Sequence, residues 1–147
     1  MVHPDLPQVI PLAPKFIRKQ DGHTKQDCEI TAGRRAIERI RSEYPHLSMI
    51  LVADSLYTFA PTIRHLKGQR CLYLLVAKPG DHNSLFEDID GLRRGGMLDQ
   101  WECKEESGRR HVYEWANQIP LNADLKSPEV KFVQLAIFND EGIQTFR

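Results

Sequence analysis

The sequence predicts an α/β protein in which parallel strands with crossover helices are followed by an antiparallel β lobe. Two short, nearly continuous apolar runs, Leu47 to Ala53 and Cys71 to Ala77, flank a helical segment, which is typical of strands covered on both faces in a parallel sheet. From Met97 onward, strand-like segments are separated by turn signals alone. We therefore expect residues 1–92 to form the parallel part and residues 93–147 the β lobe.

The first third of the chain contains one expected strand and one expected helix. Gln8 to Arg18 has strand character, but two prolines restrict it to the edge of a sheet. Thr24 and Asp27 have the spacing of a capping box, and the helix that they open ends at Pro45. One side of this helix is basic and contains Arg34, Arg35, Arg39 and Arg41. Such a side is more often a solvated surface than a DNA-binding surface.

Two further helices connect and follow the apolar runs. Thr58 is expected to cap the connecting helix, which stops at Gly68. Ser84, with a glutamate three residues later, has capping-box spacing for a short helix that ends near Gly91. The β lobe should then contain four strands: Met97 to Lys104, Arg109 to Ala116, Val130 to Asn139 and Ile143 to Phe146.

Length and composition limit the classes of protein. The 147 residues allow one domain, or one domain with a small lobe, and the formal net charge of +0 does not indicate a nucleic-acid partner. The longest apolar run, seven residues, is far below the roughly 20 needed to span a bilayer, and the N-terminus has no signal-peptide pattern, so we expect a cytoplasmic protein. The cysteines have no C-x-x-C spacing and are expected to be reduced and structural: Cys28, Cys71 and Cys103.

Asp54 is the first candidate for chemistry, because ligands of open parallel sheets bind beyond the carboxyl ends of the strands. The same edge should hold the loop from Lys78 to His82, which follows the second apolar run. An aspartate at this position can cap the next turn. It can also be a metal ligand or a phosphoacceptor, although one carboxylate does not make a two-metal site.

Four stretches, in this order, carry a resemblance to a known family: Val9-Ile10-Pro11-Leu12-Ala13-Pro14; Asp21-Gly22-His23 with Lys25-Gln26-Asp27-Cys28-Glu29; Ala53-Asp54-Ser55-Leu56-Tyr57; and Leu75-Val76-Ala77-Lys78-Pro79-Gly80-Asp81-His82. They resemble the middle of the catalytic domain of DDE transposases of bacterial insertion sequences. The match runs through nearly the whole chain.

The resemblance implies a partial RNase H-like fold and Mg²⁺- or Mn²⁺-dependent hydrolysis and strand transfer at transposon DNA ends. It makes Asp54 the second carboxylate of a D, D, E triad and places the other two outside these residues. Residues 93–147 would be an incomplete β-rich insertion. We therefore expect an internal fragment that is inactive alone, with an incomplete core and exposed strand edges, and that associates with itself or with a complementary transposase chain.

Other residues could contribute to such a site. Lys78 and His82 are candidates for contacting a DNA phosphate. Turn or cap roles are favoured over metal binding for Asp81, Asp5 and Asp21. Trp101 and Trp115 could stack on DNA bases, although core packing is favoured.

Two alternatives remain open. A receiver-like phosphoacceptor domain also has an Asp after one strand and a Lys-Pro pair after the next, but it needs an acidic pair before Asp54 that the sequence does not supply, and it fits the antiparallel tail poorly. The other alternative is a non-catalytic fragment that binds a full-length transposase or its DNA.

Overall fold

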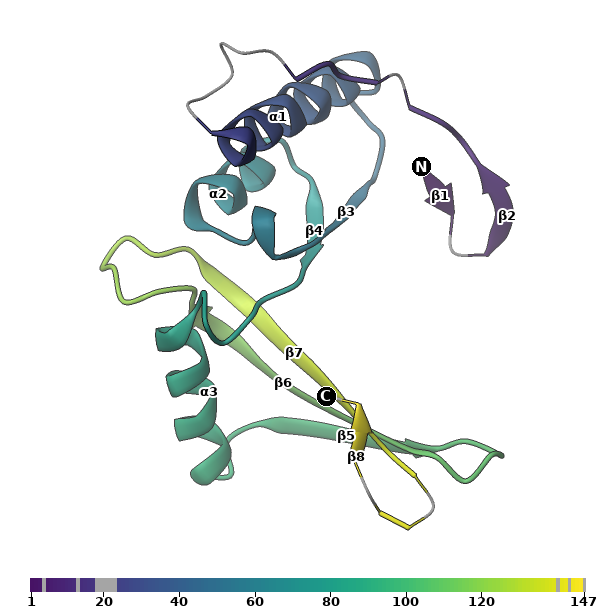
Figure 1. Cartoon of the computed structure of the whole chain (residues 1–147), viewed down its shortest axis with the longest axis vertical. Helices are drawn as coiled ribbons and strands as arrows, with labels where there is room; N and C mark the ends of the chain where they lie inside the picture. Colours follow the sequence, from purple (N-terminus) through teal and green to yellow (C-terminus); the bar gives the residue numbers. More distant parts are fainter. Residues whose placement is uncertain (4, 13, 18–23, 140, 143, 147) are drawn as a thin grey trace. The chain divides into compact units, whose positions relative to one another are not determined.

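The chain folds as two units in the computed structural model, Met1–Val76 and Ala77–Arg147 (Figure 1). The structure describes residues 1–3, 5–12, 14–17, 24–139, 141, 142 and 144–146, without the side chains of residues 8, 25–28, 145 and 146. The division differs from the expected one at residues 92/93, because helix α3 (Asn83–Arg94) belongs with the β lobe. The mixed α/β class and the order of a parallel pair before an antiparallel sheet are confirmed.

Two helices and two parallel strands form the larger part of the first unit. They are α1 (Lys25–Glu43), β3 (Ile50–Ala53), α2 (Ala60–Gly68) and β4 (Leu72–Leu75), with the short 3₁₀ helix η2 (Ser55–Tyr57) after β3. Strands β3 and β4 are paired in parallel, as expected. Both helices cover the same face of this pair, where Ile37 of α1 and Leu66 of α2 form a core with Cys71 (Figure 1).

The opposite face of the β3–β4 pair is exposed, which corrects the expectation of strands buried on both sides. Side chains alternate along each strand, so Leu51 and Leu75 point to the core while Val52 and Leu74 point away from it. Val52 is 71% exposed and Leu74 is 63% exposed. The strands are also shorter than the apolar runs, since pairing ends where the register Ile50↔Leu72 to Ala53↔Leu75 ends.

The expected strand Gln8 to Arg18 is wrong for most of its length. Strand β2 (Leu6–Val9) pairs antiparallel with β1 (Val2–His3), and the described residues from Ile10 to Ile17 are in no strand. The prolines of this segment have no backbone N–H group to donate, and no described strand forms hydrogen bonds with it as a sheet neighbour. Arg18 lies outside the described residues.

Helix ends differ from the sequence-based expectation at three places. Phe59 precedes α2 as its N-cap residue, so Thr58 is not the cap. His82 occupies the same position before α3, and Ser84 is already helical. Gly91 does not end α3: the helix continues to Arg94, and beyond the glycine Arg93 is held by hydrogen bonds to Glu114 and Gln134 on the sheet. The side chain of Asp27 lies outside the described residues, so the Thr24–Asp27 capping box stays a prediction, but helix α1 itself is confirmed.

The second unit packs α3 against an antiparallel sheet of order β5-β6-β7-β8 (Figure 1). Its strands are β5 (Asp99–Lys104), β6 (Arg110–Pro120), β7 (Glu129–Phe138) and β8 (Gln144–Phe146), which confirms the expected meander. Gly108 and Gly142 have positive φ angles in the turns, a conformation that glycine adopts without strain. Phe86 of α3 contacts Phe132 of β7 edge to face, with ring centroids 5.7 Å apart.

No helix in the described parts of the chain has both the length and the apolar character needed to cross a membrane.

Candidate functional site

Asp54 lies immediately after β3 and begins the turn into η2. Its Oδ1 accepts a hydrogen bond from the backbone N–H of Leu56 at 3.1 Å, which makes Asp54 the N-cap of η2. The residue is exposed. Its carboxylate therefore has a structural role through one oxygen and remains open to solvent, so the cap and the ligand interpretations are compatible.

Two neighbouring side chains fix the turn that carries Asp54. The hydroxyl of Thr58, which is buried, donates a hydrogen bond of 2.6 Å to the carbonyl of Val76 and so links η2 to the end of β4. The hydroxyl of Tyr57 donates to the carbonyl of Glu29 on α1 at 3.4 Å. Burial, with smaller effects of the carboxylates of Glu29 and Asp54, raises the pKa of Tyr57 above its ordinary value. Tyr57 therefore stays a neutral donor around pH 7.

Helix α1 has a glycine where the ring of Tyr57 approaches it. A Cβ atom added at Gly33 would lie 2.9 Å from the Tyr57 hydroxyl oxygen. The absence of a side chain at Gly33 thus provides the space that Tyr57 occupies. Tyr57, Thr58 and Gly33 are positioning residues for Asp54, and sequence reasoning missed all three roles.

Lys78 and His82 belong to the second unit, and their relation to Asp54 stays a prediction. The side chain of Lys78 is exposed, which suits contact with an anion. His82 is 9% exposed, and its Nε2 has no hydrogen-bond partner among the described atoms. In this conformation His82 presents little surface to a phosphate.

The remaining acidic candidates lie at exposed positions. Asp81 is in the turn before α3, and Asp5 is in the turn between β1 and β2, 3.9 Å from the imidazole of His3. Asp21 lies outside the described residues. Among the residues that the structure describes, no group of three His, Cys, Asp or Glu side chains could hold a metal ion.

The two tryptophans differ in exposure. Trp101 is 55% exposed on β5 and stacks on Tyr113 with ring centroids 5.4 Å apart, so the expectation of core packing is wrong for this residue. It lies on an outer strand of the sheet, where only one neighbouring strand can shield it. Trp115 is half-buried beside Lys131, whose Nζ lies 5.8 Å from the ring centroid.

The basic side of α1 is bound largely to the protein itself. The guanidinium of Arg41 donates to the carbonyls of Leu47 and Gln69, each at 2.8 Å, and to that of Arg70 at 3.0 Å. It thereby joins the loop before β3 to the loop before β4. Arg35 donates to the carbonyl of Phe16. These contacts correct the expectation of a solvated surface for Arg41 and Arg35, whereas Arg39 is exposed and pairs with Glu43 of the same helix, as that expectation has it. They give no support to a DNA-binding surface.

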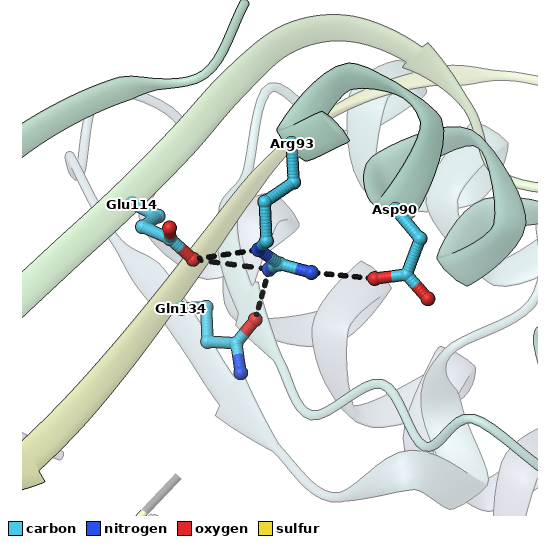
Figure 2. A network of polar contacts seen from close by, with 4 residues as sticks. All are labelled: Asp90, Arg93, Glu114 and Gln134. Atoms are coloured by element: carbon cyan, nitrogen blue, oxygen red, sulfur yellow. Dashed lines mark hydrogen bonds and ion pairs between the residues drawn. The ribbon is translucent and has the colours of Figure 1, made fainter. Parts of the chain in front are cut away.

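A polar cluster on the second unit was not anticipated from the sequence (Figure 2). Arg93 of α3 donates from Nε and Nη2 to one carboxylate oxygen of Glu114, at 3.1 and 3.0 Å, and from Nη2 to Gln134 at 2.9 Å. Asp90 accepts from Nη1. Glu114 and Gln134 are register partners on β6 and β7, so the cluster joins the last turn of α3 to two strands.

A hollow of about 300 Å³ lies beside this cluster on the sheet. Its lining includes Arg93, Glu114, Gln134 and Arg110. Arg110 is itself engaged, with a 3.0 Å ion pair to Glu102 and its guanidinium carbon 4.5 Å from the ring centroid of Phe138. Because the charged groups already pair with one another, this arrangement favours attachment of α3 over binding of an anion.

No protein-family model matches the chain, and neither a curated protein nor a solved structure shows significant similarity to it.

Proposed function

We propose that the chain is the part of a DDE transposase catalytic domain that carries the second of the three carboxylates, and that it does not cleave DNA by itself. The observation that carries the proposal is the position of Asp54, exposed directly after the first strand of a parallel pair. The four stretches that resemble these enzymes support it. The antiparallel sheet that follows is compatible with a β-rich insertion, and an RNase H-like ancestry is part of the same proposal.

The metal requirement explains the expected lack of activity. Magnesium coordinates about six oxygen ligands, and a pair of metal ions needs several carboxylates from different elements. Asp54 supplies one carboxylate, and the described residues contain no group of three His, Cys, Asp or Glu side chains that could hold a metal ion. These residues therefore do not fit a Mg²⁺ or Mn²⁺ pair, which would need carboxylates from another segment or another chain.

A chimera provides the test. The chain replaces the corresponding segment of a complete DDE transposase, and cleavage at the transposon DNA ends is measured with Mg²⁺. We expect Asp54→Asn to abolish cleavage, because a neutral amide is a poor ligand for a hard cation. Asp81→Asn is the matched control, since Asp81 is also exposed after a strand of the same parallel pair, and it should retain cleavage.

Equal cleavage by the parent chimera and Asp54→Asn would contradict the proposed role of Asp54. The chain itself is tested separately by Mn²⁺ binding, followed by electron paramagnetic resonance, and by plasmid nicking. Tight stoichiometric Mn²⁺ binding or nicking that depends on Asp54 would contradict the proposed inactivity.

A further inference from the structure

The hollow on the sheet of the second unit has a regular construction. On the face that α3 contacts, strands β6 and β7 present three consecutive register pairs: Arg110↔Phe138, Val112↔Ala136 and Glu114↔Gln134. Residues on the same face of one strand are about 7 Å apart, so the two outer pairs lie about 14 Å from each other. The middle pair has short side chains and therefore forms the aliphatic floor of a slot between two taller walls.

The first wall of the slot is a flat stack. The guanidinium carbon of Arg110 lies 4.5 Å from the ring centroid of Phe138, and the charge of Arg110 is paired with Glu102 at 3.0 Å. A guanidinium stacked on an aromatic ring presents a planar surface. This wall therefore suits contact with another planar group.

The second wall offers a hydrogen-bond acceptor beside a donor. Arg93 bonds to a single carboxylate oxygen of Glu114 and to the amide oxygen of Gln134. The other carboxylate oxygen and the amide nitrogen are turned away from Arg93, and no described residue bonds to either of them (Figure 2). The Glu114 side chain is only 26% exposed. Part-buried polar groups with unused bonding capacity favour a ligand that supplies the matching donor and acceptor.

The properties of the slot limit the class of ligand. Its volume of about 300 Å³ admits one small group, and the charges of both walls are already paired. The ligand is therefore uncharged and planar, with a donor next to an acceptor on its edge. Nucleobases that carry an exocyclic amino group have these features, because a carboxylate accepts from the amino group and a glutamine amide donates to a ring nitrogen.

We infer that the slot binds an adenine or cytosine ring, supplied by a free nucleoside or by a base of a single-stranded nucleic acid. Glu114 accepts from the exocyclic amino group, and Gln134 donates to the adjacent ring nitrogen. The ring lies on the aliphatic floor, next to the wall that Phe138 forms. The inference does not depend on the proposed transposase reaction, since the second unit alone forms the slot.

Titration of the isotope-labelled full chain with adenosine up to about 5 mM, followed by nuclear magnetic resonance, tests the inference. We expect saturable shifts of the Gln134 side-chain amide and of the backbone amides of Val112 and Ala136, with a Kd on the order of 0.1–1 mM. Purine riboside, which lacks the exocyclic amino group, should bind at least tenfold more weakly. A short single-stranded oligodeoxyadenylate is the second probe. Shifts at these residues with adenosine alone assign the slot to nucleosides, and shifts with the oligonucleotide assign it to bases in a strand.

A variant of the floor locates the binding. Ala136→Leu fills the slot and keeps both hydrogen-bonding side chains, so the Kd for adenosine should rise at least tenfold. Val133→Leu is the matched control, because it adds bulk to the opposite face of β7, where Val133 is 52% exposed, and the Kd should not change. Urea unfolding followed by tryptophan emission checks that both variants fold.

Three results would overturn the inference. The first is the absence of a saturable shift with either probe. The second is unchanged adenosine binding by folded Ala136→Leu, since adenosine would then bind elsewhere. The third needs no variant: equal affinities of the wild-type chain for adenosine and purine riboside would show that the amino group is not recognised.

Discussion

Removal of Arg93 should destabilise the second unit through a measurable coupling with Glu114. The two side chains are only 28% and 26% exposed, and two N–H groups of Arg93 reach the same carboxylate oxygen. Hydrogen bonds between charged groups contribute about 1.5–3 kcal/mol, and partial burial limits the competition from water. Arg93→Met keeps the aliphatic part of the side chain but leaves Glu114 without its charged partner, so we expect a loss of about 2–3 kcal/mol.

A double-mutant cycle isolates this coupling. Glu114→Gln should cost about 1 kcal/mol, because an amide oxygen can still accept from Arg93, and the double variant should lose about 1.5 kcal/mol less than the sum of the single changes. Both tryptophans of the chain, Trp101 and Trp115, lie in the second unit, so urea unfolding followed by tryptophan emission reports this unit alone.

Asp90→Asn is the control for the cycle. The side chain of Asp90 is 60% exposed, and exposed ion pairs contribute little, so this change should cost less than about 0.5 kcal/mol. Single-variant effects that add to within about 0.3 kcal/mol would refute the reasoning, because the Arg93–Glu114 contact would then contribute nothing of its own.

Three further outcomes follow from the structure. Arg41→Met should destabilise the first unit by about 2–3 kcal/mol, because two part-buried hydrogen bonds to the carbonyls of Leu47 and Gln69 are lost. Chemical labelling of the Cys71 thiol, followed peptide by peptide, should therefore become faster on the order of 100-fold, and an unchanged labelling rate would contradict this. The raised pKa of Tyr57 means that the folded state holds the phenolic proton more tightly than the unfolded state does, so the contribution of Tyr57 to stability is complete below the ordinary pKa of 10.0 and is lost as the pH rises through the folded pKa. Tyr57→Phe should therefore flatten the fall in stability at alkaline pH, and an unchanged pH profile would show that Tyr57 is not the cause of this fall. Gly91→Ala should raise the stability of the second unit by about 0.5–1 kcal/mol in the tryptophan-monitored unfolding, because Gly91 lies inside α3 and an added Cβ meets nothing within 4 Å; a destabilised variant would place the helix end at Gly91 after all.

Much of the candidate site was open to prediction because it depends on local pattern. The apolar run before Asp54 indicates a strand, and an aspartate after a strand indicates a turn, so its position at the end of β3 follows from neighbours in the sequence. Whether its carboxylate binds a metal depends on residues distant in sequence, which local pattern does not reveal. The supports from Tyr57 and Thr58 were missed for the same reason, since their partners lie 28 and 18 residues away.

From α1 onward, the sequence by itself determined the order of the main helices and strands, the parallel pairing of β3 with β4 and the antiparallel meander, because hydrophobic periodicity and turn residues act over a few positions. Only the tertiary structure decided which side of each strand is covered. An apolar run is the same whether one face or both are buried, and the exposure of Val52 and Leu74 appears only once the helices are seen on the opposite face. The roles of Arg41 and Arg93 were also decided there, since an arginine on a helix has the same local pattern whether it faces water or joins elements distant in the chain.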